Sequence, residues 1–426
     1  MTKSLKLLIF FAITLQTVDS PAQSYIVFYN TAQEDLKKGD VQSFKMNMEK
    51  ADSARPNHPV IMYNLAKGYM LNSETEQAFK TLKVLLHFYA SPEILDTTDF
   101  SSLKSSDAWK KLNEEVLDYR KIVKTSKVAF EFEEPGLHPE GIAYDHHTGD
   151  FYLTDIREGL IYRFKKAEGN LEPFMDLKEF GFWSAMGIIA DPVYSDVLWV
   201  TTSAMPQFSG YTEEDKGKSA VLKISKAGKK ILSSYTTDGE HTFGDITTTE
   251  KGKIFITDSQ NPEVFTIDRN DVLNAAFRHD EWWNLQGLAL SDDERFLYVS
   301  DYITGVFRIE INTGEIKPLI NENEWLRGGD GIYQKGGKLI ILQNGTIPKR
   351  VAKISLNENG LGNSETLVFP DQAREDINEP TLGTWVNGDL YYIGNSPWGY
   401  YGDDNKPKLD EWPKLKIFRL TKTGQN

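Results

Sequence analysis

The sequence predicts a mainly β protein, a six-bladed β-propeller preceded by a small α-helical domain. The main observation is a phrase that recurs six times over the last 300 residues: a glycine, a short apolar run, a polar turn and a second β-rich run. The glycines recur after 46, 57, 43, 44 and 52 residues, and they are Gly141, Gly187, Gly244, Gly287, Gly331 and Gly383. This period matches one four-stranded propeller blade and is too long for a leucine-rich or tetratricopeptide unit.

Strand-like segments stand at both ends of the repeat array, and they are the second observation. Residues 127–132 and 414–420 both alternate apolar and polar positions at period two. Pairing these segments in one blade would close the ring and remove exposed sheet edges. We therefore assign residues 127–426 to the propeller.

Residues 23–126 have a helical period instead. Apolar residues fall at helical spacing over residues 60–70 and 78–86, which predicts two or three helical hairpins. Small residues such as Ala66 and Ala78 would let these helices approach closely. The stretch resembles tetratricopeptide units over about 60 residues, and about two units fit. Because fewer than three such repeats rarely stand alone, we expect them to pack against the propeller or a partner.

Residues 1–22 are typical of an export signal. Lys3 and Lys6 supply the positive end, residues 7–15 are apolar, and small residues precede Gln23, where we expect the mature chain to begin. No later segment approaches 18 consecutive apolar residues, so we expect no membrane span in the mature chain. A periplasmic or secreted protein would meet enough free calcium to fill weak sites built from oxygen ligands.

Composition and missing motifs narrow the chemistry. The net charge of −14, without a long basic run, disfavours nucleic acid as a partner. The absence of cysteine from the sequence excludes disulfides, thiolate metal sites and a cysteine nucleophile. The sequence also lacks the GxSxG, GxxxxGK and HExxH patterns of serine hydrolases, phosphate loops and zinc proteases. Oxygen and imidazole chemistry remain.

The residue before each repeat glycine is a candidate for the central channel, because every blade aims its equivalent position there. These residues are Glu140, Met186, Phe243, Gln286, Asp330 and Leu382. Two carboxylates and one amide would converge near one channel mouth, and such hard oxygen ligands suit Ca²⁺ better than zinc or copper. The plainer alternative is that Glu140 and Asp330 only accept hydrogen bonds from nearby backbone N–H groups.

The phrases PEG, QGLALSDDERFLYVSD and DGI, which carry Glu140, Gln286 and Asp330, resemble a known family. Residues 128–422 are similar to the gluconolactonase, senescence-marker and strictosidine synthase-like superfamily, which also includes the paraoxonases. In its gluconolactonase branch a glutamate, an asparagine and an aspartate at these positions bind a divalent metal. Gln286 replaces the asparagine. The family's third-blade ligand has no clear match, since Phe243 stands in register, and we take Asp245 as its substitute.

The resemblance implies a gluconolactonase-like hydrolase that opens a lactone or ester with the help of Ca²⁺ or another divalent cation. The cation would polarise the carbonyl group, while Asp330 or His241 would take a proton from water. The ordinary pKa of a histidine suits a general base at neutral pH better than that of an aspartate, which favours His241. A lone histidine beside the start of a strand, however, commonly has a structural role. A small lactone, ester or sugar-derived molecule would be the ligand. A cluster of aromatic residues could line a ring-binding mouth, although such residues more commonly pack within or between blades: Phe182, Trp183, Trp282, Trp283, Trp398, Tyr400 and Tyr401.

A second hypothesis belongs to another class. The propeller would be a non-catalytic module that holds a ligand or a protein, and the helical region would dock a protein partner. The additional helical domain favours this hypothesis, whereas the set of oxygen ligands favours the enzyme. The fold alone does not decide between them, because propellers serve many functions.

Overall fold

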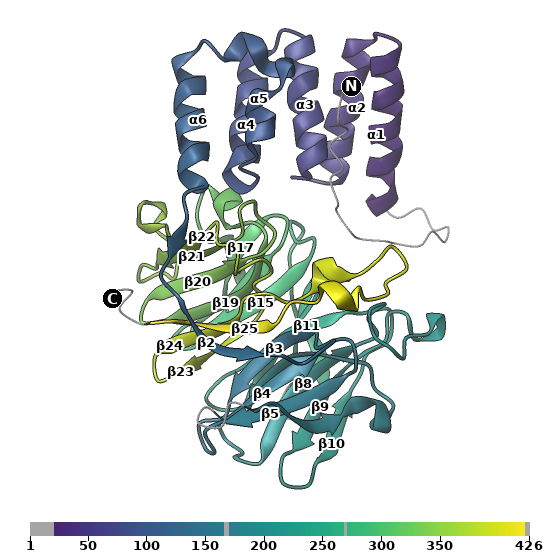
Figure 1. Ribbon diagram of the computed structural model, residues 1–426, viewed down its shortest axis with the longest axis vertical. Coiled ribbons are helices and arrows are strands. Elements are labelled where there is room, and N and C mark those ends of the chain that lie inside the picture. The colour runs from purple at the N-terminus through teal and green to yellow at the C-terminus, as the bar shows by residue number, and fades with distance from the viewer. Residues whose placement is uncertain (1–20, 166–169, 268–270, 422–426) are drawn as a thin grey trace.

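The computed structural model describes residues 21–165, 170–267 and 271–421, in which a layer of helices stands on a ring of β-sheets (Figure 1). The predicted export signal falls mostly on residues 1–20, which lie outside this range. The first helix already begins at Pro21. Within the described ranges, no helix is long and apolar enough to cross a membrane.

The helical layer consists of antiparallel helices, with two short elements before the last one (Figure 1). In chain order these are α1 (Pro21–Lys37), α2 (Val41–Ala54), α3 (Pro59–Leu71), α4 (Thr75–Phe88), α5 (Pro92–Asp96), the 3₁₀ turn η1 (Thr98–Leu103) and α6 (Asp107–Tyr119). The predicted close approach of the helices is confirmed, because Ala66 and Ala78 are fully buried. Gly68 adds to it, since a Cβ there would lie 3.2 Å from the Cα of Lys45.

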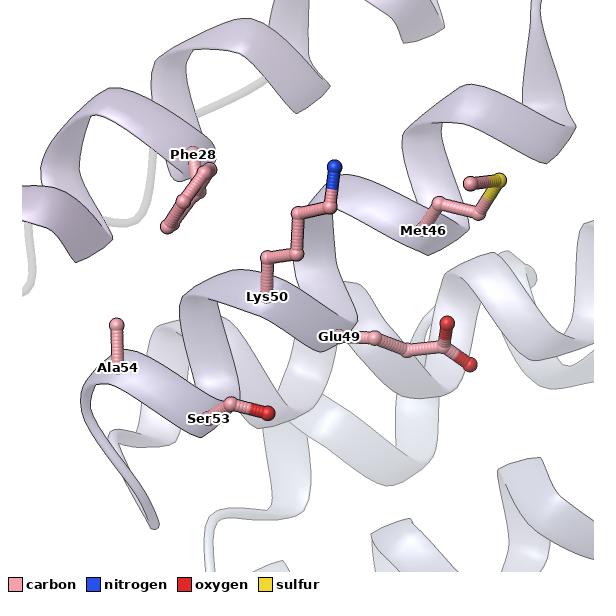
Figure 2. A pocket seen from close by; sticks show the side chains of 6 residues that line it. All are labelled: Phe28, Met46, Glu49, Lys50, Ser53 and Ala54. Carbon is pink, nitrogen blue, oxygen red and sulfur yellow. The ribbon is translucent and has the colours of Figure 1, made fainter.

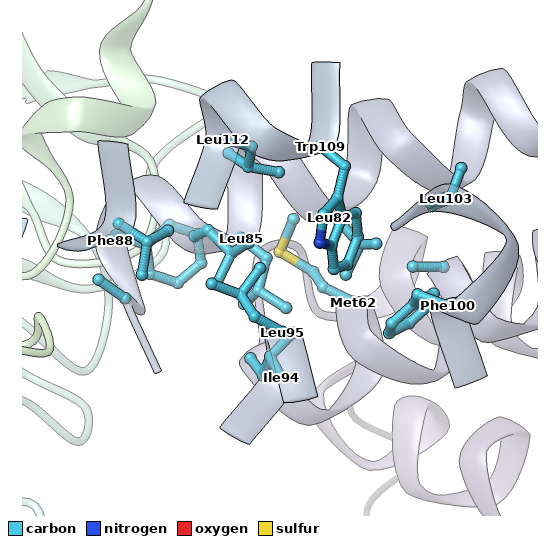
Figure 3. Close-up of a cluster of buried hydrophobic side chains, with 14 residues drawn as sticks. Met62, Leu82, Leu85, Phe88, Ile94, Leu95, Phe100, Leu103, Trp109 and Leu112 are labelled. Carbon is cyan, nitrogen blue, oxygen red and sulfur yellow. The ribbon is translucent and has the colours of Figure 1, made fainter. Parts of the chain in front are cut away.

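An apolar core joins α3, α4, α5 and α6 (Figure 3). Leu82, Leu85, Phe100 and Trp109 are among its buried members. Each of these side chains removes apolar surface from water, which is the main stabilising contribution to such a small helical unit. The helical region therefore has a core of its own and is held to the ring by further contacts.

The ring consists of six sheets, each with its strands in antiparallel order. Blades one to three are β3 (Pro139–Tyr144), β4 (Asp150–Asp155), β5 (Leu160–Lys165), β6 (Glu172–Asp176); β7 (Ser184–Ala190), β8 (Val197–Ser203), β9 (Ser219–Ser225), β10 (Lys230–Tyr235); and β11 (Phe243–Thr248), β12 (Ile254–Asp258), β13 (Glu263–Ile267), β14 (Leu273–Arg278).

Blades four to six are β15 (Leu285–Leu290), β16 (Phe296–Asp301), β17 (Gly305–Glu310), β18 (Glu315–Pro318); β19 (Gly329–Lys335), β20 (Lys338–Gln343), β21 (Arg350–Ser355), β22 (Val368–Gln372); and β23 (Gly383–Val386), β24 (Asp389–Ile393), β25 (Leu415–Leu420) with β2 (Lys127–Phe132). The strand β2 pairs with β25, so the predicted closure of the ring is confirmed.

The linker between the two layers also joins a sheet. The short strand β1 (Val123–Lys124) pairs with β22 and becomes a fifth strand of blade five. Next to it, the buried carboxylate of Asp371 accepts hydrogen bonds from the backbone N–H of Ser126, at 3.2 Å, and from the guanidinium of Arg374, at 2.6 Å. These contacts fix the chain where it passes from helices to ring.

At Gly141, Gly187, Gly287 and Gly331 the glycine is explained by the close approach of neighbouring blades around the channel. A Cβ at Gly141 would lie 2.5 Å from the carbonyl oxygen of Met186 in the next blade. A Cβ at Gly331 would lie 2.5 Å from the carbonyl oxygen of Thr381. Hydroxyl groups link the same strands, since Thr154 Oγ1 donates to the carbonyl of Met186 at 2.5 Å. At these four positions the glycine is thus a packing requirement of the ring.

A β-bulge recurs on the innermost strands of blades one to five, and its position decides which residue takes the channel position. In blade one the pairing with β4 skips from Pro139 to Ile142, so Glu140 and the repeat glycine form the bulge. In blade three it skips from Phe243 to Ile246. The third blade is therefore shifted by one residue relative to its glycine, and our placement of Phe243 at the channel position is wrong: its side chain is fully buried in the blade core.

Candidate functional site

Glu140 and Asp330 occupy equivalent bulge positions on β3 and β19, in blades one and five. Both residues are buried, with exposed fractions of 8% and 7%. Burial raises the pKa of the Glu140 carboxyl well above its ordinary value, and the negative charge of Asp330 raises it further. Burial also raises the pKa of Asp330. The two carboxylates that the repeat singled out thus lie within electrostatic range of each other.

Each of these carboxylates has one fixed hydrogen-bond donor from a loop. Trp398 Nε1 donates to Glu140 Oε2 at 2.9 Å, and Asn344 Nδ2 donates to Asp330 Oδ2 at 2.6 Å. The plainer alternative, in which backbone N–H groups satisfy the two carboxylates, therefore does not describe these contacts. The other amide atom, Asn344 Oδ1, is buried and has no hydrogen-bond partner among the described residues.

Two more carboxylates lie within electrostatic range of this pair. Asp245 accepts hydrogen bonds from the backbone N–H of Ile246, at 2.8 Å, and of Leu288, at 3.2 Å, and burial raises its pKa to about 7. Glu379 forms an ion pair with Lys349, at 3.3 Å between Oε2 and Nζ. The charges of Asp245 and Glu379 act on both members of the pair. Among the described residues, the carboxylates of Glu140, Asp245 and Glu379 and the ammonium group of Lys349 thus lie within electrostatic range of Asp330.

Gln286 lies at the bulge of β15, equivalent to the position of Glu140. Its side-chain Nε2 donates to Asn284 Oδ1 at 2.6 Å, and its backbone carbonyl accepts a 2.6 Å hydrogen bond from Thr257 Oγ1. The residue is half-buried. The structure therefore places Gln286 in the predicted register and directs its amide nitrogen towards Asn284, within the same blade.

His241 has both ring nitrogens engaged within its own blade. Nδ1 lies 2.5 Å from Asp258 Oδ2, and Nε2 lies 2.9 Å from the carbonyl oxygen of Asp238. Although burial acts to lower its pKa, the hydrogen bond and the charge of Asp258 raise it overall. Asp258 also accepts a hydrogen bond from the backbone N–H of Thr242, as a residue that caps a turn does. The structure gives no support to His241 as a general base.

The donor set of the channel fits a hard divalent cation. No group of three or more His, Cys, Asp or Glu side chains in the described ranges has a ready-made metal-binding arrangement. Two buried carboxylates that repel each other are stabilised either by protons or by a cation, and Asn344 Oδ1 adds a neutral oxygen without a partner. Two carboxylates and one amide oxygen are ligands of the kind that Ca²⁺ accepts.

Three residues of the site were not among those predicted: Asn344, Lys349 and Glu379. Lys349 and Glu379 lie in loops outside the repeat phrases, where no periodicity points to the channel. Asn344 lies one residue beyond Gln343, which is the blade-five equivalent of the phrase-ending Asp155 and Asp301, so the repeat did not point to it either.

A separate hollow lies on the helical layer (Figure 2). It has a volume of about 500 Å³, and its lining residues belong to α1 and α2: Phe28, Met46, Glu49, Lys50, Ser53 and Ala54. Ile26 and Val27 on α1 are 46% and 62% exposed. This surface is apolar and open, and it shares no residue with the channel site.

Comparisons with known proteins concern the propeller part of the chain. Neither family models nor curated protein sequences match the chain. Among solved structures, the Malassezia sympodialis allergen Mala s 1 aligns with a TM-score of 0.51 and 12% identity, over 68% of this chain and 95% of that one. The likeness shows the fold. It extends over a share of the chain comparable to that of the propeller.

Two further solved structures align less well. A luciferin-regenerating enzyme gives a TM-score of 0.48 and 15% identity, over 70% of this chain and 95% of that one. A calcium-binding protein, regucalcin from Agrobacterium tumefaciens, gives 0.47 and 12% identity, over 69% and 93%. At these identities the likeness concerns the architecture, and the chemistry has to be argued from the residues of the channel.

Proposed function

We propose that the channel mouth binds a divalent cation, Ca²⁺ in preference, and that the protein hydrolyses a small lactone or ester there. The observation that supports this proposal is the pair of buried carboxylates, Glu140 and Asp330, beside the unpartnered Asn344 Oδ1. When Asp245 and Glu379 are included, the ionised carboxylates give the site an excess of negative charge. Lys349 alone does not balance this excess. A divalent cation would compensate most of it.

Glu140, Asp330 and Asn344 would hold the cation, with Asp245 and Gln286 as further candidates from blades three and four. When bound, the cation supplies Lewis-acid polarisation of a carbonyl oxygen. Trp398 keeps Glu140 in place through its 2.9 Å hydrogen bond, and this indole is half-buried at the mouth. A sugar-derived ring would meet its aromatic face.

Asp330 is our candidate for accepting a proton from water. Asn344 holds Oδ2 of this carboxylate and so fixes its orientation. Burial raises the pKa of Asp330, which makes its ionised form a stronger base than an ordinary aspartate. Lys349 donates to the carbonyl of Asn344 and pairs with Glu379, so it supports the orienting residue. We leave His241 out of this role because both its nitrogens are engaged.

The cellular setting and the partners are part of the proposal. We propose export to the periplasm or the exterior, on the basis of residues 1–22. The alternative function, a binding propeller with a helical docking domain, draws support from the open apolar hollow between α1 and α2. A partner seated there would contact Phe28 and Met46.

Calorimetry with Ca²⁺ tests the proposal directly. We expect heat of binding for the wild-type protein and none for the double variant Glu140→Gln, Asp330→Asn. A matched control is Asp280→Asn, Glu281→Gln, which removes the same charge from an exposed loop. If the wild type binds none of Ca²⁺, Mg²⁺, Mn²⁺ and Zn²⁺, the hydrolase proposal fails. If it binds, a panel of lactones and esters follows, with hydrolysis lost in the channel variant and kept in the control.

A further inference from the structure

The helical layer forms a backbone contact with a loop of the channel mouth. The loop between β20 and β21, residues 344–349, presents Ile347 to the end of α4. The N–H of Ile347 donates to the carbonyl of Phe88 at 2.9 Å, and the N–H of Ala90 donates to the carbonyl of Ile347 at 2.7 Å. Tyr89 and Ile347 thereby form a parallel β-bridge. Two hydrogen bonds fix the tip of the loop to the helical layer.

The same loop holds the acidic side chains of the channel. Asn344, three residues before Ile347, donates to Asp330 Oδ2 at 2.6 Å. Lys349, two residues after it, pairs with Glu379 at 3.3 Å. The tip of the loop contacts the helices while both of its ends contact channel carboxylates.

The base of the loop is tied to the helical layer by a buried arginine. Arg350 is 2% exposed, and its guanidinium donates to the carbonyls of His87, at 3.1 Å, and Trp325, at 3.0 Å. It also donates from Nε to Gln343 Oε1 at 2.8 Å. The ring of His87 stacks on that of Trp325 with 3.9 Å between centroids. Arg350 is the first residue of β21, and it therefore links Gln343, the last residue of β20, to the end of α4.

The ring side leaves the loop little freedom to shift. A Cβ at Gly345 would lie 2.5 Å from the Cα of Gly328 and 2.6 Å from the ring of Tyr302. Gly345 also donates a backbone hydrogen bond to Gly328 at 3.0 Å. The loop is thus held between the neighbouring blade on one side and the helical layer on the other.

We propose that the helical layer is a positioning part of the channel site. The segment from Phe88 to Ala90 would hold the β20–β21 loop so that Asn344 and Lys349 stay on Asp330 and Glu379. The predicted tetratricopeptide-like region would then act on the chemistry of the ring rather than serve only as a docking module. This inference rests on the proposed function where cation affinity is measured, and it stands independently where the order of the loop is measured.

The test perturbs the contact from the helical side. Ala90→Pro removes the N–H that donates to Ile347, and Leu82→Ala is the control, because it opens a cavity in the same helical core and leaves that N–H intact. Hydrogen exchange of residues 344–349 and Ca²⁺ calorimetry are the two measurements. We expect Ala90→Pro to speed exchange in the loop and to weaken Ca²⁺ binding about tenfold, and the control to change neither.

A second variant breaks the contact from the ring. Arg350→Met retains a long unbranched side chain but removes the hydrogen-bond donors to His87 and Trp325. We expect it to speed loop exchange and to weaken Ca²⁺ binding, so it replaces Ala90→Pro as the test if that variant does not fold. Folded variants with wild-type loop exchange and wild-type affinity would overturn the inference. A wild-type protein that binds no cation would overturn the proposed function instead, and loop exchange would still decide on the positioning role.

Discussion

The indole Nε1 of Trp398 donates a 2.9 Å hydrogen bond to Glu140 Oε2 and so connects the loop between β24 and β25 to the innermost strand of blade one. The same indole lies edge-on to His138, with 4.5 Å between ring centroids, and His138 Nδ1 lies 2.7 Å from the hydroxyl of Tyr401. Tyr401 is buried, whereas Trp398 is half-buried. Among the aromatic residues predicted to line a channel mouth, Trp398 directly contacts Glu140, a candidate metal-ligating residue.

Replacing Trp398 with phenylalanine should weaken cation binding. The variant loses a hydrogen bond that favours the charged form of Glu140 and thereby limits the rise of its pKa. A hydrogen bond to a charged group contributes about 1.5–3 kcal/mol, so we expect Ca²⁺ affinity to fall by about tenfold or more. Calorimetry measures the change. Trp283→Phe, at an exposed loop position, is the control and should bind like the wild type.

Replacing Glu140 with glutamine should stabilise the cation-free protein. One of two buried carboxylates that repel each other becomes neutral, and the amide oxygen can still accept from Trp398. A gain of about 1 kcal/mol would raise the melting temperature by about 2–4 °C. Thermal unfolding in EDTA should show this rise, and saturating Ca²⁺ should reverse the order, because only the wild type gains from binding. A variant less stable than the wild type in EDTA would contradict electrostatic repulsion at this pair.

His87 should make the stability of the protein depend on pH. Neither of its ring nitrogens has a hydrogen-bond partner in the described part of the chain. Burial lowers its pKa to about 4, and the charges of Lys83, Arg350 and Arg327 act in the same direction. Between about pH 6.5 and pH 4 the unfolded chain binds a proton that the folded chain does not. Stability is therefore complete above this window and is lost as the pH falls through it.

The variant His87→Phe keeps an aromatic ring against Trp325 and removes the titrating group. We expect the loss of unfolding free energy between pH 8 and pH 5 to be smaller than in the wild type by about 2 kcal/mol. Urea unfolding at the two pH values measures it, and the value at pH 8 separates the pH effect from any general change in stability. Equal losses in both proteins would show that His87 is not responsible.

The repeat was sufficient to predict the ring, because its two parts have physical causes that the sequence records. The glycine is required where neighbouring blades approach, as at Gly141, and the hydroxyl of Thr154 links adjacent blades. The closing pair of strands was predicted from their positions at the ends of the array, and β2 does pair with β25. Such constraints act locally and recur, so one sequence suffices to show them.

The channel site was only partly predictable. Glu140 and Asp330 follow from the repeat, but the bulge in blade three is shifted by one residue relative to its glycine, so Gly244 takes the position of Glu140 and Phe243 lies in the blade core. Asp245 takes the position of Gly141, and its charge still acts on Glu140. A strand's side chains alternate faces, and one residue of shift therefore changes which group is available. Glu379 and Lys349 come from loops whose path depends on the whole fold, and no spacing in the sequence places them beside the other acidic residues.

The shifted bulge makes a last prediction with a built-in control. Gly141→Ala would place a Cβ 2.5 Å from the carbonyl oxygen of Met186 and 2.9 Å from Thr154 Oγ1, so the strand has to move. Gly244→Ala would place its Cβ 3.6 Å from Thr257 Oγ1, which is an ordinary contact. Both are repeat glycines, and alignment by glycine alone treats them as equivalent.

We therefore expect Gly141→Ala to lower the free energy of unfolding by about 3 kcal/mol, the upper part of the range for overpacked sites. Gly244→Ala should change it by less than about 1 kcal/mol. Urea denaturation of both variants measures the difference. The two costs diverge because the bulge moves Gly244 to the position that Glu140 occupies in blade one, where a side chain is accommodated, and gives Asp245 the position of Gly141. Equal destabilisation by the two substitutions would mean that the bulges of blades one and three share one register.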